Sequence, residues 1–339
     1  MWVLHCTEMN DIREITDQLL QPQRGIFAAD ESPKSADKRL ASFGEKTGAL
    51  SRWEFRELFL STEGMEKYLT GVILHEETLF QTADDDESFS KKLRAHGVLP
   101  GIKVDEGTEA MPESPKELIT KGLIGLPERL VEYRDKHEAA FTKWRAVITI
   151  DGDKLPTSAC LVENAKRLAS YARMVQEAQM VPIVEPEVLY DGTHGRARSR
   201  EVIKKTLEVL MNAIDDHAVD HKGLIIKTSM ALSGKGTNKI DTPEEVAKDT
   251  VDALMASVPG TVGGIVFLSG GQTPDQSIEN LAAITRYAKE VKAPWPLTFS
   301  FARTFQEDAL TIWKGKDENV PSAREAFLAR LKQATLALA

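Results

Sequence analysis

Gly223-Leu224-Ile225-Ile226-Lys227-Thr228-Ser229 is an apolar run with the length of a buried strand, and it leads into a lysine. By itself this lysine has two interpretations. It either marks the point where a strand reaches solvent, which is the usual position of a lysine, or it lies in a polar cavity among other cations. In such a cavity its amine is kept neutral and becomes a nucleophile. The rest of the sequence has to distinguish the two.

Seven further apolar runs lie along the chain, and helical patterns separate them. The eight predicted strands span residues 25–30, 71–76, 99–104, 144–148, 181–185, 224–227, 264–269 and 296–300. Apolar residues recur every 3.6 positions in between, most clearly at 158–179, 199–217, 242–257 and 275–289. Thr242 and Thr273, each followed by proline, are predicted to cap two of these helices. Alternating strands and helices form a parallel sheet, and eight strands with polar endings favour a closed (β/α)8 TIM barrel over an open doubly wound sheet.

The composition indicates a folded chain without internal boundaries. The 339 residues are 42% hydrophobic and 28% charged, which is typical of a globular protein. No linker or low-complexity tract divides them. We therefore expect a single barrel domain over residues 1–339, with its strands within about 25–302, an N-terminal helix at about 9–21 and C-terminal helices at about 306–338.

Composition also restricts the location and the partners. No apolar run approaches the ~18 residues that cross a bilayer, and the first residues do not resemble a signal peptide. The chain has two cysteines, Cys6 and Cys160, which suits a reducing compartment. A net charge of −9 argues against nucleic acid as a partner. We expect a cytoplasmic protein that binds neither membrane nor nucleic acid.

Several predicted strands end in charged or small polar residues. One such residue is usually a solvated edge, but side chains two apart in a strand point the same way, and parallel strands end at one rim. Five cations at strand ends in an acidic protein predict an anion site there: Lys103, Lys143, Arg145, Lys227 and Arg303. The turn at residues 269–272 adds unobstructed backbone N–H groups where barrels commonly bind phosphate.

Six stretches resemble, in order, the signatures of class I fructose-bisphosphate aldolase: residues 28–32, 101–105, 143–145, 181–187, 267–272 and 297–300. The resemblance extends from about Gly25 to beyond Arg303. It implies a lyase without metal or cofactor that reversibly cleaves fructose 1,6-bisphosphate, in glycolysis and gluconeogenesis. The products are dihydroxyacetone phosphate and glyceraldehyde 3-phosphate. It also implies a lysine Schiff base, a sugar-phosphate substrate and a homo-oligomer, either dimer or tetramer.

The resemblance assigns roles to individual residues. It implies that Lys227 forms the Schiff base beside the cations Lys103 and Lys143, that Glu185 moves protons with Glu187 close by, and that Asp30 removes the hydroxyl proton that starts cleavage. It implies one phosphate pocket made of Ser269, Gly270, Gly271, Ser300 and Arg303, and another made of Ser32, Ser35, Lys103 and Arg145. Ser35 also precedes a helical pattern at residues 36–40, so we expect it to cap that helix.

The sequence departs from the family's usual pattern in four places. Thr228 and Ser229 replace the usual Pro-Asn pair after the lysine, which we expect to relax the backbone there. Ala302 stands where the animal enzymes usually have glycine, and Pro33-Lys34 replaces a Thr-Gly pair, so affinity for phosphate is harder to predict than the chemistry. The sequence stops at Ala339 without the tyrosine-ended tail of the animal enzymes. We expect another residue to assist the proton exchange, or that step to be slower.

Other functions fit the sequence less well. A zinc-dependent aldolase needs clustered histidines, and the pair His217 and His221 lacks the glutamate of a metalloprotease motif. The run at residues 233–237 lacks the first glycine of a nucleotide-binding loop. A non-catalytic sugar-phosphate sensor would not need Lys227, Glu185 and Asp30 together. A Schiff-base enzyme for a monophosphate or another ketose phosphate stays open.

Overall fold

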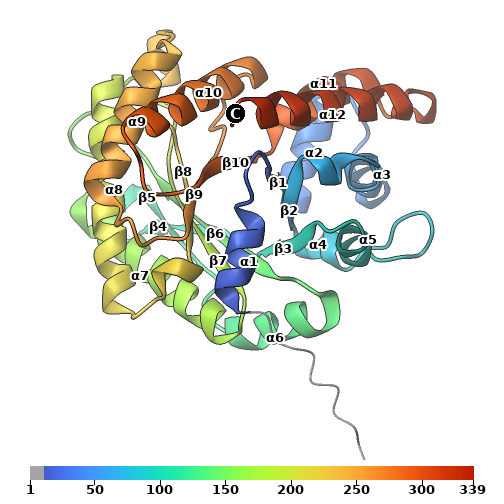
Figure 1. The fold of residues 1–339 in the computed structure, drawn as a ribbon, viewed down its shortest axis with the longest axis horizontal. Coiled ribbons are helices and arrows are strands. Elements are labelled where there is room, and N and C mark those ends of the chain that lie inside the picture. Colours follow the sequence, from blue (N-terminus) through green and yellow to red (C-terminus); the bar gives the residue numbers. More distant parts are fainter. Residues whose placement is uncertain (1–10) are drawn as a thin grey trace, which may run out of the picture.

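A computed structural model describes residues 11–339 (Figure 1). Cys6 and the first part of the predicted N-terminal helix lie outside this range. The helix itself, α1 (Ile12–Leu19), begins where the Asp11 side chain accepts a hydrogen bond from the Arg13 N–H. None of the helices in residues 11–339 combines the length and the apolarity that would let it cross a membrane.

Eight parallel strands close into a barrel, in the order β1-β10-β9-β8-β7-β6-β3-β2. These strands are β1 (Gly25–Ala29), β2 (Leu69–Leu74), β3 (Leu99–Lys103), β6 (Phe141–Ile148), β7 (Val181–Val188), β8 (Ile225–Thr228), β9 (Gly264–Phe267) and β10 (Leu297–Phe301). The predicted (β/α)8 barrel is confirmed, because each strand overlaps one of the predicted apolar runs.

Helices surround the barrel (Figure 1). They are α2 (Pro33–Ser42), α3 (Ala49–Leu60), α4 (Glu76–Leu79), α5 (Phe89–Ala95), α6 (Leu126–His137), α7 (Ser158–Glu177), α8 (Arg196–Asp216), α9 (Pro243–Ser257), α10 (Pro274–Glu290), α11 (Arg303–Trp313) and α12 (Val320–Leu336). Thr242 and Thr273 cap α9 and α10 as predicted, each within a reciprocal capping box. The helices predicted between the strands are therefore present, with ends that differ by a few residues.

The core has two parts because successive strand residues face opposite sides of the sheet. Ile26 belongs to the cluster inside the barrel and Phe27 to the larger one between strands and helices. The Phe141 ring fills the barrel interior, and it fits only because two neighbours are glycines. A Cβ on Gly101 would lie 2.4 Å from this ring, and one on Gly71 would lie 3.0 Å from it.

Two features differ from the predicted strands. Strand β7 continues through Pro186, paired with Ala146, to Val188, so Glu187 lies within the strand rather than at or beyond its end. A hairpin of β4 (Thr108–Met111) and β5 (Ser114–Thr120) follows β3, where none of the predicted strands lies. The hairpin has little apolar surface of its own, which is why its sequence gives no strand pattern.

The C-terminal helices pack against the barrel helices. Phe327 of α12 lies 5.2 Å from Phe27 between ring centroids, which ties α12 to β1. The last residues rest on α10, where Thr285 Oγ1 donates to the Ala337 carbonyl at 2.7 Å and Lys289 Nζ donates to the Ala339 carbonyl at 2.5 Å. This end of the chain is thus part of the packed structure.

Candidate active site

A cavity of about 990 Å³ opens at the carboxyl ends of the strands, the end at which barrels carry their active sites. The residue types that the sequence analysis selected gather here. All the predicted site residues except Gly271 line this cavity: Asp30, Ser32, Ser35, Lys103, Lys143, Arg145, Glu185, Glu187, Lys227, Ser269, Gly270, Ser300 and Arg303. Gly271 lies next to a residue of the lining, since a Cβ there would be 3.5 Å from the Arg303 guanidinium.

Two lysines and two acids form a continuous buried network at the floor of the cavity. Glu185 Oε1 lies 3.0 Å from Lys227 Nζ, and its Oε2 lies 3.0 Å from Lys143 Nζ. Lys143 Nζ also lies 2.5 Å from Asp30 Oδ2. Only 4% of Lys227 and 3% of Lys143 is exposed. Lys227 is therefore a buried amine bonded to a carboxylate, and the solvent-exposed interpretation is wrong.

The network controls the protonation of its acids. Burial by itself would raise the pKa of Asp30, but the charges of Lys143 and Lys227 outweigh burial and hold this pKa well below its usual value. The pKa of Glu185 is lowered by the same balance of burial against the two lysines. Burial would lower the pKa of Lys143, and the carboxylates of Asp30 and Glu185 raise it instead. Asp30 and Glu185 are thus ionised at neutral pH and can accept protons.

Strand register arranges the next layer of charges. Arg145 pairs with Glu185 in the β6–β7 ladder, and Val147 pairs with Glu187. The Arg145 guanidinium reaches forward to bond the Glu187 carboxylate, which outweighs burial and raises the pKa of Arg145. Lys103 Nζ donates to Asp105 Oδ1 at 2.6 Å. Each of these cations is held in place by one acid and still borders the cavity.

The first predicted phosphate pocket lies beside β9 and β10. Gly270 and Gly271 have φ of 59° and 93°, a left-handed backbone that favours glycine. Helix α11 begins at Arg303 after Ala302, whose side chain makes no capping bond. Within the described residues, the N–H groups of Arg303 and Thr304 have no backbone partner, so they are available to an anion. The Ser300 hydroxyl is buried and has no hydrogen-bond partner among the described residues. This turn, helix start and hydroxyl suit a phosphate.

The second predicted pocket lies at the start of α2. Ser32 caps this helix by accepting the Ser35 N–H at 3.3 Å, and its hydroxyl donates to Ser35 Oγ at 3.1 Å. The expectation that Ser35 is the cap is wrong, because Pro33 supplies the first helical residue and moves the start three positions earlier. Lys38 and Arg39 of the same helix also line the cavity.

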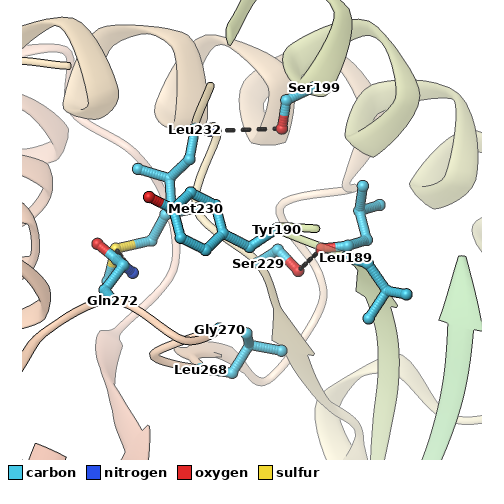
Figure 2. A pocket seen from close by; sticks show the side chains of 10 residues that line it. Leu189, Tyr190, Ser199, Ser229, Met230, Leu232, Leu268, Gly270 and Gln272 are labelled. Carbon is cyan, nitrogen blue, oxygen red and sulfur yellow. Dashed lines mark hydrogen bonds between the residues drawn. The ribbon is translucent and has the colours of Figure 1, made fainter. Parts of the chain in front are cut away.

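Hydrogen bonds hold the two residues that follow Lys227. Strand β8 continues one residue past the lysine, and the Thr228 carbonyl accepts the Leu268 N–H at 3.0 Å. Ser229 Oγ then donates to the Val188 carbonyl at 2.8 Å (Figure 2). Figure 2 also shows Tyr190 and Gly270 around the small hollow behind this segment. The Ser229 hydroxyl therefore ties this segment to the end of β7, whereas the bond at the Thr228 carbonyl needs no particular side chain.

The cavity is also lined by polar residues that the sequence analysis did not select, among them Glu31, His75 and Asp105. Glu31 follows Asp30, His75 follows β2, and Asp105 binds Lys103. His75 had the same signal as the residues that were found, a polar side chain directly after an apolar run.

The histidines considered for zinc have other partners. His217 bonds the Ala213 carbonyl and the Ser170 hydroxyl. His221 bonds Thr261 and Asp215. Both rings are thus engaged by the protein, on the outside of the barrel.

Comparisons with known proteins agree with this geometry. The family model for fructose-bisphosphate aldolase class-I matches residues 11–339. A probable fructose-bisphosphate aldolase class 1 from Xanthomonas campestris is 41% identical over 330 residues, 97% of each chain. The cytosolic fructose-bisphosphate aldolase 6 of Arabidopsis thaliana is 44% identical over 311 residues, 92% of this chain and 86% of that one. The fructose-bisphosphate aldolase structure from Plasmodium falciparum superposes with a TM-score of 0.94 at 37% identity, covering 97% of this chain and 94% of that chain. The chain therefore belongs to the class I fructose-bisphosphate aldolase family.

Proposed function

We propose that this protein reversibly cleaves fructose 1,6-bisphosphate to dihydroxyacetone phosphate and glyceraldehyde 3-phosphate, with Lys227 as the residue that forms the Schiff base. One observation carries the assignment to Lys227. Its Nζ is buried at the floor of a cavity, 3.0 Å from a Glu185 oxygen. A nucleophilic lysine needs a group that takes its proton and later returns it. Glu185 lies at hydrogen-bond distance from Lys227 and can serve as that group.

The first half of the reaction uses Lys227 and Glu185. Glu185 first takes a proton from the Lys227 ammonium, which leaves the amine neutral. The amine attacks the ketone carbon, and Glu185 gives its proton to the carbonyl oxygen and takes one from the nitrogen, giving a carbinolamine. Glu185 then donates that proton to the departing hydroxyl, water leaves, and a protonated Schiff base remains. Lys143 stays charged at 3.0 Å from Glu185 and stabilises its carboxylate form between these steps.

The second half uses Asp30. This carboxylate takes the proton of the hydroxyl next to the bond that breaks, and the C–C electron pair moves into the Schiff base, which becomes an enamine. The aldehyde product leaves with its new carbonyl. Because the pKa of Asp30 is held below its usual value, the acid is ready as a base at neutral pH. Protonation of the enamine and hydrolysis of the Schiff base then release dihydroxyacetone phosphate and restore Lys227.

The remaining residues of the site bind and orient the substrate. We assign one phosphate to Ser269, Gly270, Gly271, Ser300 and Arg303, and the other to Ser32, Ser35, Lys103 and Arg145. Glu187 holds the Arg145 guanidinium. The cavity has two separate groups of anion ligands, which favours a bisphosphate over a monophosphate. Turnover of fructose 1,6-bisphosphate should therefore exceed that of fructose 1-phosphate, and equal turnover would favour a broader ketose-phosphate enzyme.

Borohydride reduction tests the assignment directly. With dihydroxyacetone phosphate present, reduction should fix the ligand to Lys227, and peptide mapping by mass spectrometry should find the added mass on that residue. Lys227→Arg is the matched control and should show no adduct. An adduct on another lysine, or none in the wild type, would rule out the mechanism.

We also propose a cytoplasmic homo-oligomer. Relatives from Arabidopsis thaliana and Spinacia oleracea are named cytosolic and cytoplasmic, and the charge of −9 with two cysteines suits the same compartment. Three large apolar side chains around α4 and α6 are exposed, Phe80, Ile124 and Val131, which is consistent with a subunit contact. Light scattering would measure the mass, and a 37.5 kDa species at micromolar concentration would contradict the oligomer.

A further inference from the structure

His75 lies at the rim of the cavity between two strands that carry proposed catalytic or binding residues. Strand β2 ends at Leu74, which pairs with Ala29 of β1 and with Ile102 of β3. The next residue in each strand is therefore level with the other two: Asp30, His75 and Lys103. Since neighbouring strands are about 4.8 Å apart, His75 stands beside Asp30 on one side and Lys103 on the other.

The side chain of His75 faces the cavity. Leu74 is fully buried in the outer core, between the barrel and its helices, so its successor faces the opposite side. His75 accordingly lines the cavity together with Asp30 and Lys103. Both neighbours are engaged elsewhere, Asp30 with Lys143 and Lys103 with Asp105.

One ring nitrogen of His75 is occupied, and this fixes the tautomer. Nδ1 accepts the Glu77 backbone N–H at 3.2 Å and thereby caps α4, so in the neutral ring the proton is on Nε2. Burial, with the charges of Lys103 and Arg56, lowers the pKa of His75, which keeps the ring neutral at pH 7. Within residues 11–339, Nε2 has no protein hydrogen-bond partner.

We propose that His75 is a further catalytic residue, which donates its Nε2–H to the substrate oxygen beside the bond that breaks. This inference rests on the proposed aldolase reaction and extends it. The oxygen is the one whose proton Asp30 takes, and Asp30 and His75 are adjacent at the same level. In cleavage the donor stabilises the negative charge that develops on this oxygen. In the reverse direction it polarises the aldehyde carbonyl, as neutral imidazoles do in other enzymes. His75 keeps its proton throughout.

A neutral donor suits the position beside Asp30 better than a charged one. A protonated imidazole beside Asp30 would compete with the substrate hydroxyl for the carboxylate, whereas a neutral N–H leaves Asp30 free to act as a base. The groups that face His75 are Asp30 from β1, Lys103 from β3, Arg56 from α3 and Glu77 from α4. The Glu77 carboxylate is bonded to Arg52 and Arg56, which turns it toward α3.

Two substitutions separate the donor from the cap. In His75→Ser and His75→Asn a short side chain can still accept the Glu77 N–H, since both residues are good helix caps, but neither reaches the position of Nε2. His75→Gln places an amide N–H closer to that position. His96→Ser is the matched control, because His96 is exposed at the end of α5 and borders no part of the cavity.

We expect kcat/KM for cleavage of fructose 1,6-bisphosphate to fall about 10- to 100-fold in His75→Ser and His75→Asn, at or below the roughly 100-fold lower limit for loss of an oxyanion donor. The KM for glyceraldehyde 3-phosphate in condensation should rise, and His75→Gln should retain more activity than the other two. Borohydride trapping of dihydroxyacetone phosphate on Lys227 does not involve the aldehyde half, so it should match the wild type in all variants.

Two results would overturn the proposal. Cleavage within about twofold of the wild type in both His75→Ser and His75→Asn would mean that His75 only caps α4. A parallel loss of Lys227 trapping would mean that the substitutions disturb the whole site. Failure of the proposed function itself is seen separately, because the wild type would then show no Lys227 adduct.

Discussion

Replacing Lys143 by methionine should destabilise the protein strongly, because this lysine compensates two buried carboxylates. Its Nζ lies 2.5 Å from Asp30 and 3.0 Å from Glu185, with 3% of the side chain exposed. At an effective dielectric constant of about 20, unit charges 3.0 Å apart attract by about 5.5 kcal/mol. Desolvation of the lysine offsets part of this attraction. We therefore expect the free energy of unfolding to fall by about 3–5 kcal/mol at pH 7, as for other broken buried pairs.

The loss should depend on pH in a defined direction. The pKa values of Asp30 and Glu185 are below their usual range in the folded protein, so their pairing stabilises the fold above the ordinary carboxyl pKa of about 4. In Lys143→Met the carboxylates lose this charge while burial still acts to raise their pKa values, so the folded variant binds protons at a higher pH than the wild type. The variant should therefore regain stability on acidification, while the wild type changes little. The difference in free energy of unfolding between wild type and variant should be smaller at pH 5 than at pH 7.

Urea unfolding at pH 7 and pH 5 measures both effects, and two variants serve as controls. Lys227→Met leaves Lys143 between the two acids, so it should cost less than Lys143→Met. Adding Asp30→Asn to Lys143→Met removes one stranded charge and should recover part of the stability. Three results would refute the reasoning. Lys143→Met could lose less than about 1 kcal/mol of its free energy of unfolding, or Lys227→Met could lose as much as Lys143→Met. The difference in this free energy between wild type and Lys143→Met could also be larger at pH 5 than at pH 7.

Four further outcomes are expected. Ser229→Ala removes the bond to the Val188 carbonyl at 2.8 Å and should lower the free energy of unfolding by about 1–2 kcal/mol in urea; an unchanged midpoint would contradict this. Gly101→Ala places a Cβ 2.4 Å from the Phe141 ring, so the free energy of unfolding, measured by thermal melting, should fall by about 1–3 kcal/mol. An unchanged melting temperature would mean that the ring can move aside without cost. Removal of residues 337–339 should lower the melting temperature and barely change cleavage of the bisphosphate, since none of them lines the cavity; a large loss of turnover in the folded variant would argue against it. A chelator should leave the cleavage rate unchanged, whereas loss that added zinc restores would indicate a metal enzyme.

Much of the fold could be predicted because barrel strands carry a local signal. A strand buried on both faces is a short apolar run, and each of the eight runs coincides with an observed strand. Strand ends were harder: the predicted strand at residues 181–185 ends before the proline at 186, whereas β7 continues three residues further, to Val188. The hairpin at residues 108–120 escaped prediction because its stability comes from packing, as where Glu117 accepts two hydrogen bonds from Thr157.

The sequence by itself determined most of the charged residues that reach the cavity, because a polar side chain directly after an apolar run lies at the end of a strand. It could not determine which of these side chains touch. Lys227 seemed to need only other cations nearby, yet its direct partner is Glu185, and Lys143 links that acid to Asp30. These contacts depend on how β1, β6, β7 and β8 are arranged around the closed barrel. Strand order and register are long-range properties, so only the tertiary structure shows that Lys227 lies in a shared network of acids and lysines, and that His75 stands beside Asp30.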